Sequence, residues 1–168
     1  MYARDARKKN YDQKGNKASK GRLDKKLIDI YNKDPFFKLN YPKSLDREYF
    51  KKYFKQLKKL KKNNAIHTAS IMTIICIDLG LKILKKKINK LIITGGGRKN
   101  LFLINGLKKQ FKDKGINIIL IDSLNFNGDL LEAQAFAYLA VRSIKKLPLS
   151  LPTTTGVRNP TLGGILYK

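Results

Sequence analysis

Three successive glycines, Gly95, Gly96 and Gly97, are the residues whose type and spacing first suggest a ligand site. They follow an apolar run typical of a buried strand, and apolar residues at helical spacing resume after Asn100. In a strand, glycine turn and helix unit, the backbone can approach a ligand closely, and unpaired N–H groups at the helix start offer an anion or ribose site. The spacing matches neither the dinucleotide-binding nor the Walker motif, so a tight turn without a ligand is an equal alternative.

A second polar stretch, residues 122–129, follows the next predicted strand, 116–121. A strand, helix and strand with short connections predict a right-handed parallel unit, and ligands usually bind at the carboxyl edge of such a sheet. Asp129 is expected to cap a helix from 130 to about 145, whose alanines would permit close packing. Glu132 lies in the first turn of that helix. On the residues alone, a surface carboxylate favoured by the helix dipole is the simpler interpretation.

Three helices are predicted before the glycine run. The first covers about 23–31, and the second starts from Ser44 as N-cap and runs to about residue 62. Asn63 and Asn64 are expected to break it. A third helix, about 65–86, is apolar on more than one face and should therefore be central.

The two ends of the chain look different from this middle part. Residues 1–20 are basic and polar, and they are expected to form an exposed arm or a helix end whose partner is missing. Residues 147–168 predict a threonine-rich loop followed by a short last strand. With 168 residues, 42% of them hydrophobic, residues 21–168 can form a single α/β domain with a proper core.

The formal net charge of +25 raises nucleic-acid binding as an alternative function, because clustered basic residues release phosphate counterions. The bases are mostly lysines spread along the whole chain, and they are not interleaved with stacking aromatics. We therefore expect non-specific polyanion binding at low salt, with a basic nucleic-acid-binding module as the competing hypothesis.

Other features of the sequence indicate the cellular compartment and argue against several common kinds of functional site. The single cysteine, Cys76, excludes an internal disulfide framework and suits a reducing cytoplasm. The apolar run 71–79 is too short and too polar to span a membrane, and no cleavable apolar leader is visible. His67, the only histidine, has no cysteine, histidine or carboxylate partner at metal spacing, so neither a metal site nor a catalytic histidine is expected.

Taken in order, these motifs resemble the C-terminal half of the bacterial anhydro-N-acetylmuramic acid kinase family. The ordered set runs through nearly the whole chain and is more specific than any one motif. The matching segments are Asp34-Pro35-Phe36-Phe37, Pro42-Lys43-Ser44 with Arg47, Thr94-Gly95-Gly96-Gly97-Arg98-Lys99-Asn100, Asp122, Glu132-Ala133-Gln134-Ala135-Phe136-Ala137, Leu151-Pro152-Thr153-Thr154-Thr155-Gly156 and Leu162-Gly163-Gly164-Ile165.

The resemblance implies the second lobe of an actin-like ATPase or sugar kinase fold, with a mixed sheet flanked by helices. It also implies that residues 1–20 are either a basic arm or a remnant of the interlobe region. It implies nucleotide contacts at Gly95, Gly96, Gly97 and Asn100 and a sugar contact at Glu132. The implied reaction uses ATP, with Mg²⁺ expected for the complete enzyme. The enzyme adds water across the anhydro bridge of the sugar and transfers the γ-phosphoryl group, giving N-acetylmuramic acid 6-phosphate in peptidoglycan recycling.

Some family features are absent. Leu45 and Asp46 stand where the family usually has Thr and Gly, and Asn64 stands where Asp is common. The phosphate-binding loop and the catalytic aspartate belong to the first lobe in this family, so no catalytic residue is expected within these residues. We expect an inactive fragment, or a lobe that pairs with a separately encoded first lobe, and the family's habit suggests a homodimer.

Overall fold

The computed structural model describes residues 11–84 and 86–167, so the first half of the predicted basic arm lies outside the described residues. The α-helices are α1 (Lys25–Asn32), α2 (Lys51–Leu57), α3 (Lys62–Ile83), α4 (Leu101–Lys112), α5 (Leu131–Ile144) and α6 (Pro152–Thr155). The strands are β1 (Lys90–Ile93) and β2 (Asn117–Leu120), and 3₁₀ turns are η1 (Gln13–Gly15), η2 (Ala18–Lys20), η3 (Pro35–Lys38), η4 (Arg47–Phe50), η5 (Gly96–Lys99) and η6 (Ile121–Leu124).

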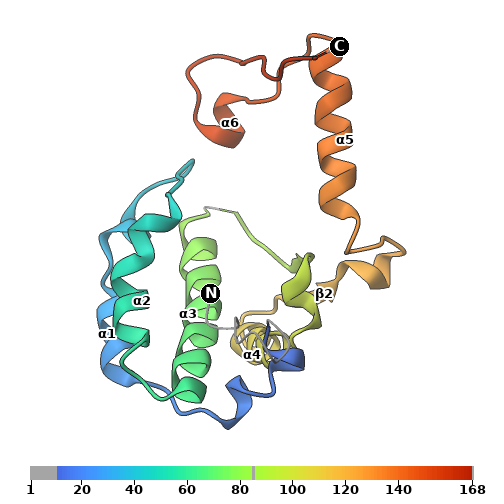
Figure 1. Cartoon of the computed structure of the whole chain (residues 1–168). Helices are drawn as coiled ribbons and strands as arrows, with labels where there is room; N and C mark the ends of the chain where they lie inside the picture. The colour runs from blue at the N-terminus through green and yellow to red at the C-terminus, as the bar shows by residue number, and fades with distance from the viewer. Residues whose placement is uncertain (1–10, 85, 168) are drawn as a thin grey trace.

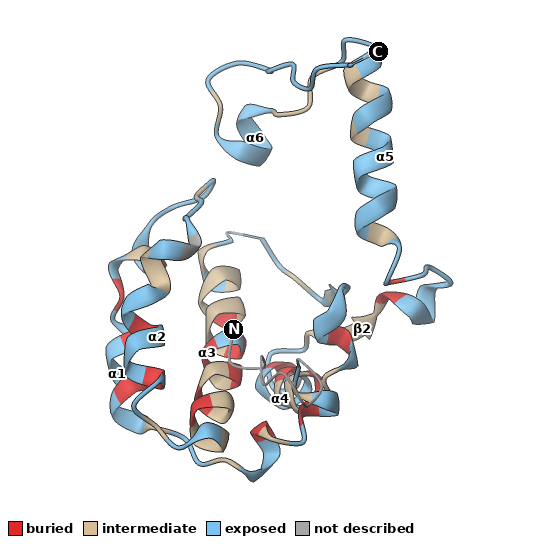
Figure 2. Cartoon of the chain, in the orientation of Figure 1, coloured by how far each residue is buried: buried red, intermediate tan, exposed pale blue. Residues whose placement is uncertain are grey.

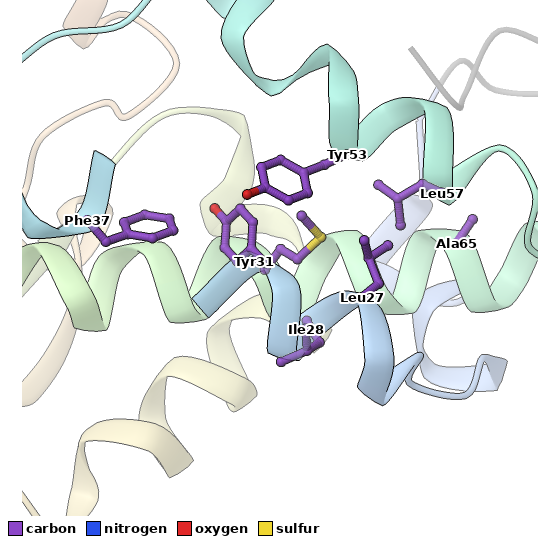
Figure 3. Packing of buried hydrophobic residues seen from close by; sticks show 8 residues of the cluster. Leu27, Ile28, Tyr31, Phe37, Tyr53, Leu57 and Ala65 are labelled. Carbon is purple, nitrogen blue, oxygen red and sulfur yellow. The ribbon is translucent and has the colours of Figure 1, made fainter. Parts of the chain in front are cut away.

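Helix α3 is the centre of the body, as its apolar pattern predicts. It alone of the described helices is long and apolar enough to cross a membrane, but its side chains enter both hydrophobic clusters, as in the core helix of a globular domain. On one side it packs against α1 and α2 (Figure 1). Figure 3 shows this first cluster, in which the rings of Tyr31 and Tyr53 meet edge to face at 4.9 Å between centroids. Its buried members are Leu27, Ile28, Tyr31, Phe37, Tyr53, Leu57, Ala65 and Met72.

The other side of α3 faces α4 and the sheet. Phe111 of α4 is completely buried, and the strand residues Leu91, Ile93, Ile118 and Leu120 pack against the same cluster. At Gly106 of α4, a Cβ atom would lie 2.3 Å from Cδ1 of Ile74. Glycine at that position therefore lets α4 approach α3 closely.

The predicted parallel pairing is confirmed, but the predicted mixed sheet is wrong for the described residues. β1 and β2 pair in parallel from Lys90↔Asn117 to Ile93↔Leu120 and form a sheet of two strands. The predicted last strand is also wrong, because the tail makes only an isolated antiparallel bridge between Ser150 and Thr161. A strand needs a neighbour to satisfy its backbone N–H and C=O groups, and the described residues supply none for 162–167.

Residues 11–20, expected as part of an exposed arm, pack on the body instead. η1 contacts α4 and η2 contacts α3. Ala18 is completely buried, and the Asp12 carboxylate accepts hydrogen bonds from the backbone N–H groups of Lys17 and Ala18 at 2.7 and 3.0 Å. This carboxylate folds a polar sequence into a compact turn, which composition alone does not reveal.

Two predicted helix boundaries are wrong. Ser44 is not the N-cap of the second helix. Asp46 takes this role at η4, where its carboxylate accepts a hydrogen bond from the Glu48 N–H at 2.7 Å. Asn64 does not break a helix but lies inside α3, because its side-chain oxygen accepts a hydrogen bond from the Arg22 N–H at 3.0 Å. A tertiary partner thus occupies the amide that would otherwise compete with the helix backbone.

Helix α5 and the tail extend away from the body (Figures 1 and 2). No residue of α5 is buried, and Phe136, Val141 and Ile144 are 64%, 50% and 65% exposed. The close packing predicted for its alanines is therefore not found within the described residues. Several exposed apolar side chains on one helix are typical of a surface that another domain or another chain covers.

Candidate functional site

An open pocket of about 420 Å³ lies at the carboxyl ends of β1 and β2, between the glycine turn and the start of α5. This is the edge of a parallel sheet at which ligands usually bind. One wall is the end of β1 with the glycine turn, and the other is the segment that leads into α5. The lining residues are Thr94, Gly95, Gly96, Gly128, Asp129, Leu131, Glu132 and Ala135.

The glycine turn is exposed and shaped by its backbone. Gly95 has φ +71°, a left-handed conformation that side chains rarely adopt. Gly95, Gly96 and Gly97 are all exposed, and no heavy atom lies within 4 Å of a Cβ built at any of them. Open space therefore lies in front of the turn, and a ligand could reach its backbone.

Asn100 ends the glycine turn and starts α4. Its side-chain oxygen accepts a hydrogen bond from the Leu103 N–H at 3.2 Å, so it is the N-cap of α4. Neither Asn100 nor Gly97 is among the residues that line the pocket. Of the residues predicted to bind ligand, the structure brings together Gly95, Gly96 and Glu132.

Arg98 is the buried centre of the site, with 5% of its surface exposed. Its Nε and Nη2 donate to the two carboxylate oxygens of Asp122 at 2.6 and 3.1 Å. Its Nη1 donates to Oδ1 of Asp129 at 2.9 Å and to the Gly95 carbonyl at 3.0 Å. Lys99 donates to the other oxygen of Asp129 at 2.6 Å. One guanidinium group therefore joins the glycine turn to the segment after β2.

These contacts stabilise the charged forms of Arg98, Asp122 and Asp129. The hydrogen bonds to Asp122 first, and to Asp129 next, raise the pKa of Arg98 above its usual range. The hydrogen bond from Arg98, and then the one from Lys99, lower the pKa of Asp129 to about 2, and Arg98 is likewise the main cause of the lowered pKa of Asp122. Because both carboxyl pKa values are lowered on folding, the stabilisation they provide is present above about pH 4 and is lost as the pH falls through the folded pKa.

Sequence reasoning missed this network and assigned Asp129 to a helix cap. The N-cap position of α5 is Leu130, with no side-chain cap, and Asp129 binds Arg98 and Lys99 instead. A signal was available. Basic residues follow β1 and acidic residues follow β2, and the carboxyl ends of parallel neighbours meet at one edge of the sheet.

His67 does not line this pocket and makes structural contacts instead. Its Nδ1 lies 2.8 Å from the Ala18 carbonyl, and its ring packs 5.0 Å from the Phe102 ring. Within residues 11–84 and 86–167, no group of three His, Cys, Asp or Glu side chains could hold a metal ion. In the pocket itself, the chemistry available is hydrogen bonding: carboxylate acceptors on Asp129 and Glu132, the Thr94 hydroxyl and glycine backbone.

The fold and the pocket define the chain as an α/β protein with an open pocket at the carboxyl edge of a small parallel sheet. The chain belongs to the anhydro-N-acetylmuramic acid kinase family, because the model of that family matches residues 1–168.

Curated relatives support the family and also show partial coverage. Anhydro-N-acetylmuramic acid kinase 1 of Jannaschia sp. (strain CCS1) is 37% identical over 153 residues, which are 91% of this chain and 40% of the relative. The anhydro-N-acetylmuramic acid kinases of Brucella anthropi and Agrobacterium fabrum are each 34% identical, over 92% and 95% of this chain and 40% and 42% of their own lengths. The chain thus spans about 40% of the length of the relatives it matches.

Proposed function

We propose that the chain is the C-terminal lobe of an ATP-dependent anhydro-N-acetylmuramic acid kinase with an actin-like fold, working in the cytoplasm in peptidoglycan recycling. The observation that carries this proposal is that the glycine turn and Glu132 line one open pocket in a chain of this family. Gly95 and Gly96 would contact the nucleotide, and the Glu132 carboxylate would accept hydrogen bonds from sugar hydroxyls.

ATP would supply the γ-phosphoryl group, and water would open the anhydro bridge. The residues of the pocket do not by themselves form a Mg²⁺ site, because Asp129 is already held by Arg98 and Lys99. A magnesium ion would therefore arrive through the nucleotide phosphates, as it does in many kinases. The part of this chain in the reaction is to hold and orient the nucleotide and the sugar.

Binding alone does not make this lobe a catalyst. Phosphoryl transfer depends on positioning and on charge stabilisation from both sides of the transferred group. The described pocket is open to one side, and its lining presents two carboxylates and no unpaired cation. We therefore propose that the chain is inactive alone and needs a complementary N-terminal lobe, with a homodimer as the assembly of the complete enzyme.

A coupled kinase assay with ATP and anhydro-N-acetylmuramic acid tests this proposal. The pure chain should give no turnover. Adding the part of the Jannaschia relative that the match does not cover should restore turnover, and Glu132→Gln should reduce it in the same mixture. Turnover by the pure chain alone would refute the need for a second lobe. Tight nucleic-acid binding that survives near-physiological salt would instead favour the basic-module alternative.

A further inference from the structure

The Arg98 guanidinium is connected to both walls of the pocket. On one side it donates to the carbonyl of Gly95, and on the other to Asp122, just after β2, and Asp129, just before α5. Gly95 and Asp129 both line the pocket, whereas Arg98 is buried behind it. A single rigid planar group therefore sets the spacing between two segments that lie far apart in the chain.

The surrounding backbone is shaped to admit this group. A Cβ at Gly128 would lie 2.4 Å from Nε and 2.7 Å from Cζ of Arg98, and 2.7 Å from Cγ2 of Ile121. Those contacts involve a buried guanidinium and a buried isoleucine, which have little room to move. Glycine at position 128 thus leaves the space that Arg98 occupies.

Arg98 is not free to bind a phosphate. Four of the five N–H groups of its guanidinium donate to Asp122, Asp129 and the Gly95 carbonyl. Two carboxylates neutralise its charge, and the second basic side chain of this cluster, Lys99, is bound to Asp129. A role through other residues therefore fits better than direct contact with a ligand.

We propose that Arg98 is a positioning residue: it fixes the glycine turn relative to Asp129 and the start of α5, and so holds the pocket in its binding shape. This inference deepens the proposed function and rests on it for the identity of the ligand. The dependence of the pocket shape on Arg98 can be measured without any ligand.

Amide hydrogen exchange of the whole chain tests the proposal, with Arg98→Lys and Gly128→Ala as variants. Arg98→Lys keeps the charge but loses the planar fork, and Gly128→Ala keeps the arginine but fills its space. Both should raise exchange of the amides at positions 98, 100 and 128 by about tenfold or more. Arg142→Lys is the matched control, because Arg142 bonds Pro148 and Tyr138 at the far end of α5 and should leave these amides unchanged.

A second readout separates positioning from general stability. The amides of β1 and β2 should keep their protection from exchange in both variants. In NMR titrations with ATP and with anhydro-N-acetylmuramic acid, the chemical-shift changes at Gly95 and at Glu132 should both be smaller in the variants than in the wild type. Equal loss of protection throughout the core, or unchanged exchange at the two walls, would overturn the positioning role. If neither compound shifts wild-type resonances even with the complementary lobe present, the proposed function fails, while the exchange result still decides the role of Arg98.

Discussion

Replacing Asp34 should destabilise the fold more than any surface carboxylate would. Asp34 is 2% exposed, and its carboxylate accepts hydrogen bonds from the Phe36 N–H at 2.9 Å, from the Tyr49 hydroxyl at 2.6 Å and from the Tyr53 hydroxyl. Lys52 lies 2.7 Å away and completes the charge pairing. This one side chain therefore ties the loop after α1 to α2.

The expected cost follows from the groups left behind. Asp34→Ala leaves the buried Tyr53 hydroxyl and the Phe36 N–H without their acceptor, and removing one partner of a buried charged cluster costs about 3–5 kcal/mol. The Lys52 ammonium is half exposed, so its share is small. Asp34→Asn keeps the shape but loses the charge and half of the acceptors, and we expect about 1–3 kcal/mol.

The effect should depend on pH. Burial raises the pKa of Asp34, but hydrogen bonds from Lys52, Tyr49 and Tyr53 outweigh it, so the folded pKa is well below the usual range. The stabilisation is then fully present above the unfolded pKa of about 4 and is lost as the pH falls toward the folded value. The difference between wild type and Asp34→Asn should therefore shrink below about pH 4.

Urea unfolding followed by far-ultraviolet circular dichroism measures these differences, since the chain has no tryptophan. Asp29→Ala is the matched control, because Asp29 is exposed on α1 and its loss should change the free energy of unfolding by less than about 0.5 kcal/mol. If Asp34→Ala behaved like this control, or if the gap grew on acidification, the reasoning about this buried carboxylate would be refuted.

Three further stability predictions can be checked by the same unfolding measurements. Phe111→Ala should cost about 3–5 kcal/mol because this side chain is completely buried between α3 and α4, and Phe111→Leu should cost clearly less. Gly15→Ala should cost more than about 1 kcal/mol, since Gly15 has φ +78° and its Cβ would lie 2.4 Å from the Asn100 side chain, whereas Gly80→Ala in open space on α3 should stabilise by about 0.5–1 kcal/mol. Asn100→Ala should cost about 1 kcal/mol by loss of the α4 cap, whereas Asn100→Asp should keep that cap and most of the stability.

The parts of the fold that follow from local patterns could be predicted from the sequence. The apolar runs before Gly95 and after Gly115 place both strands, and the short connections make them parallel. The even apolar distribution over α3 identifies it as central. Both features depend on residues close in sequence, where periodicity carries the information.

The features that were missed depend on partners far away in the chain. Asp129 reads locally as a cap, but Arg98, 31 positions earlier, binds it more strongly than a helix N-terminus would. The local sequence predicts that Asn64 breaks a helix, but its side-chain oxygen accepts a hydrogen bond from the Arg22 N–H. Where a polar side chain has several possible partners, the tertiary structure determines which one it binds, and a sequence pattern does not contain that information.

The exposed apolar residues of α5 and the two-stranded sheet share one physical feature, which is open surface that a neighbour would cover. A helix with Phe136, Val141 and Ile144 outward and a parallel sheet with two open edges both lack a neighbour among the described residues. The relatives are about two and a half times as long as the matched region, since that region is 40% of the first of them. If one docked unit of the remaining part supplies both neighbours, its docking would cover the strand edge and the α5 face together. The same part would then also close the open side of the pocket, which couples completion of the fold to completion of the site.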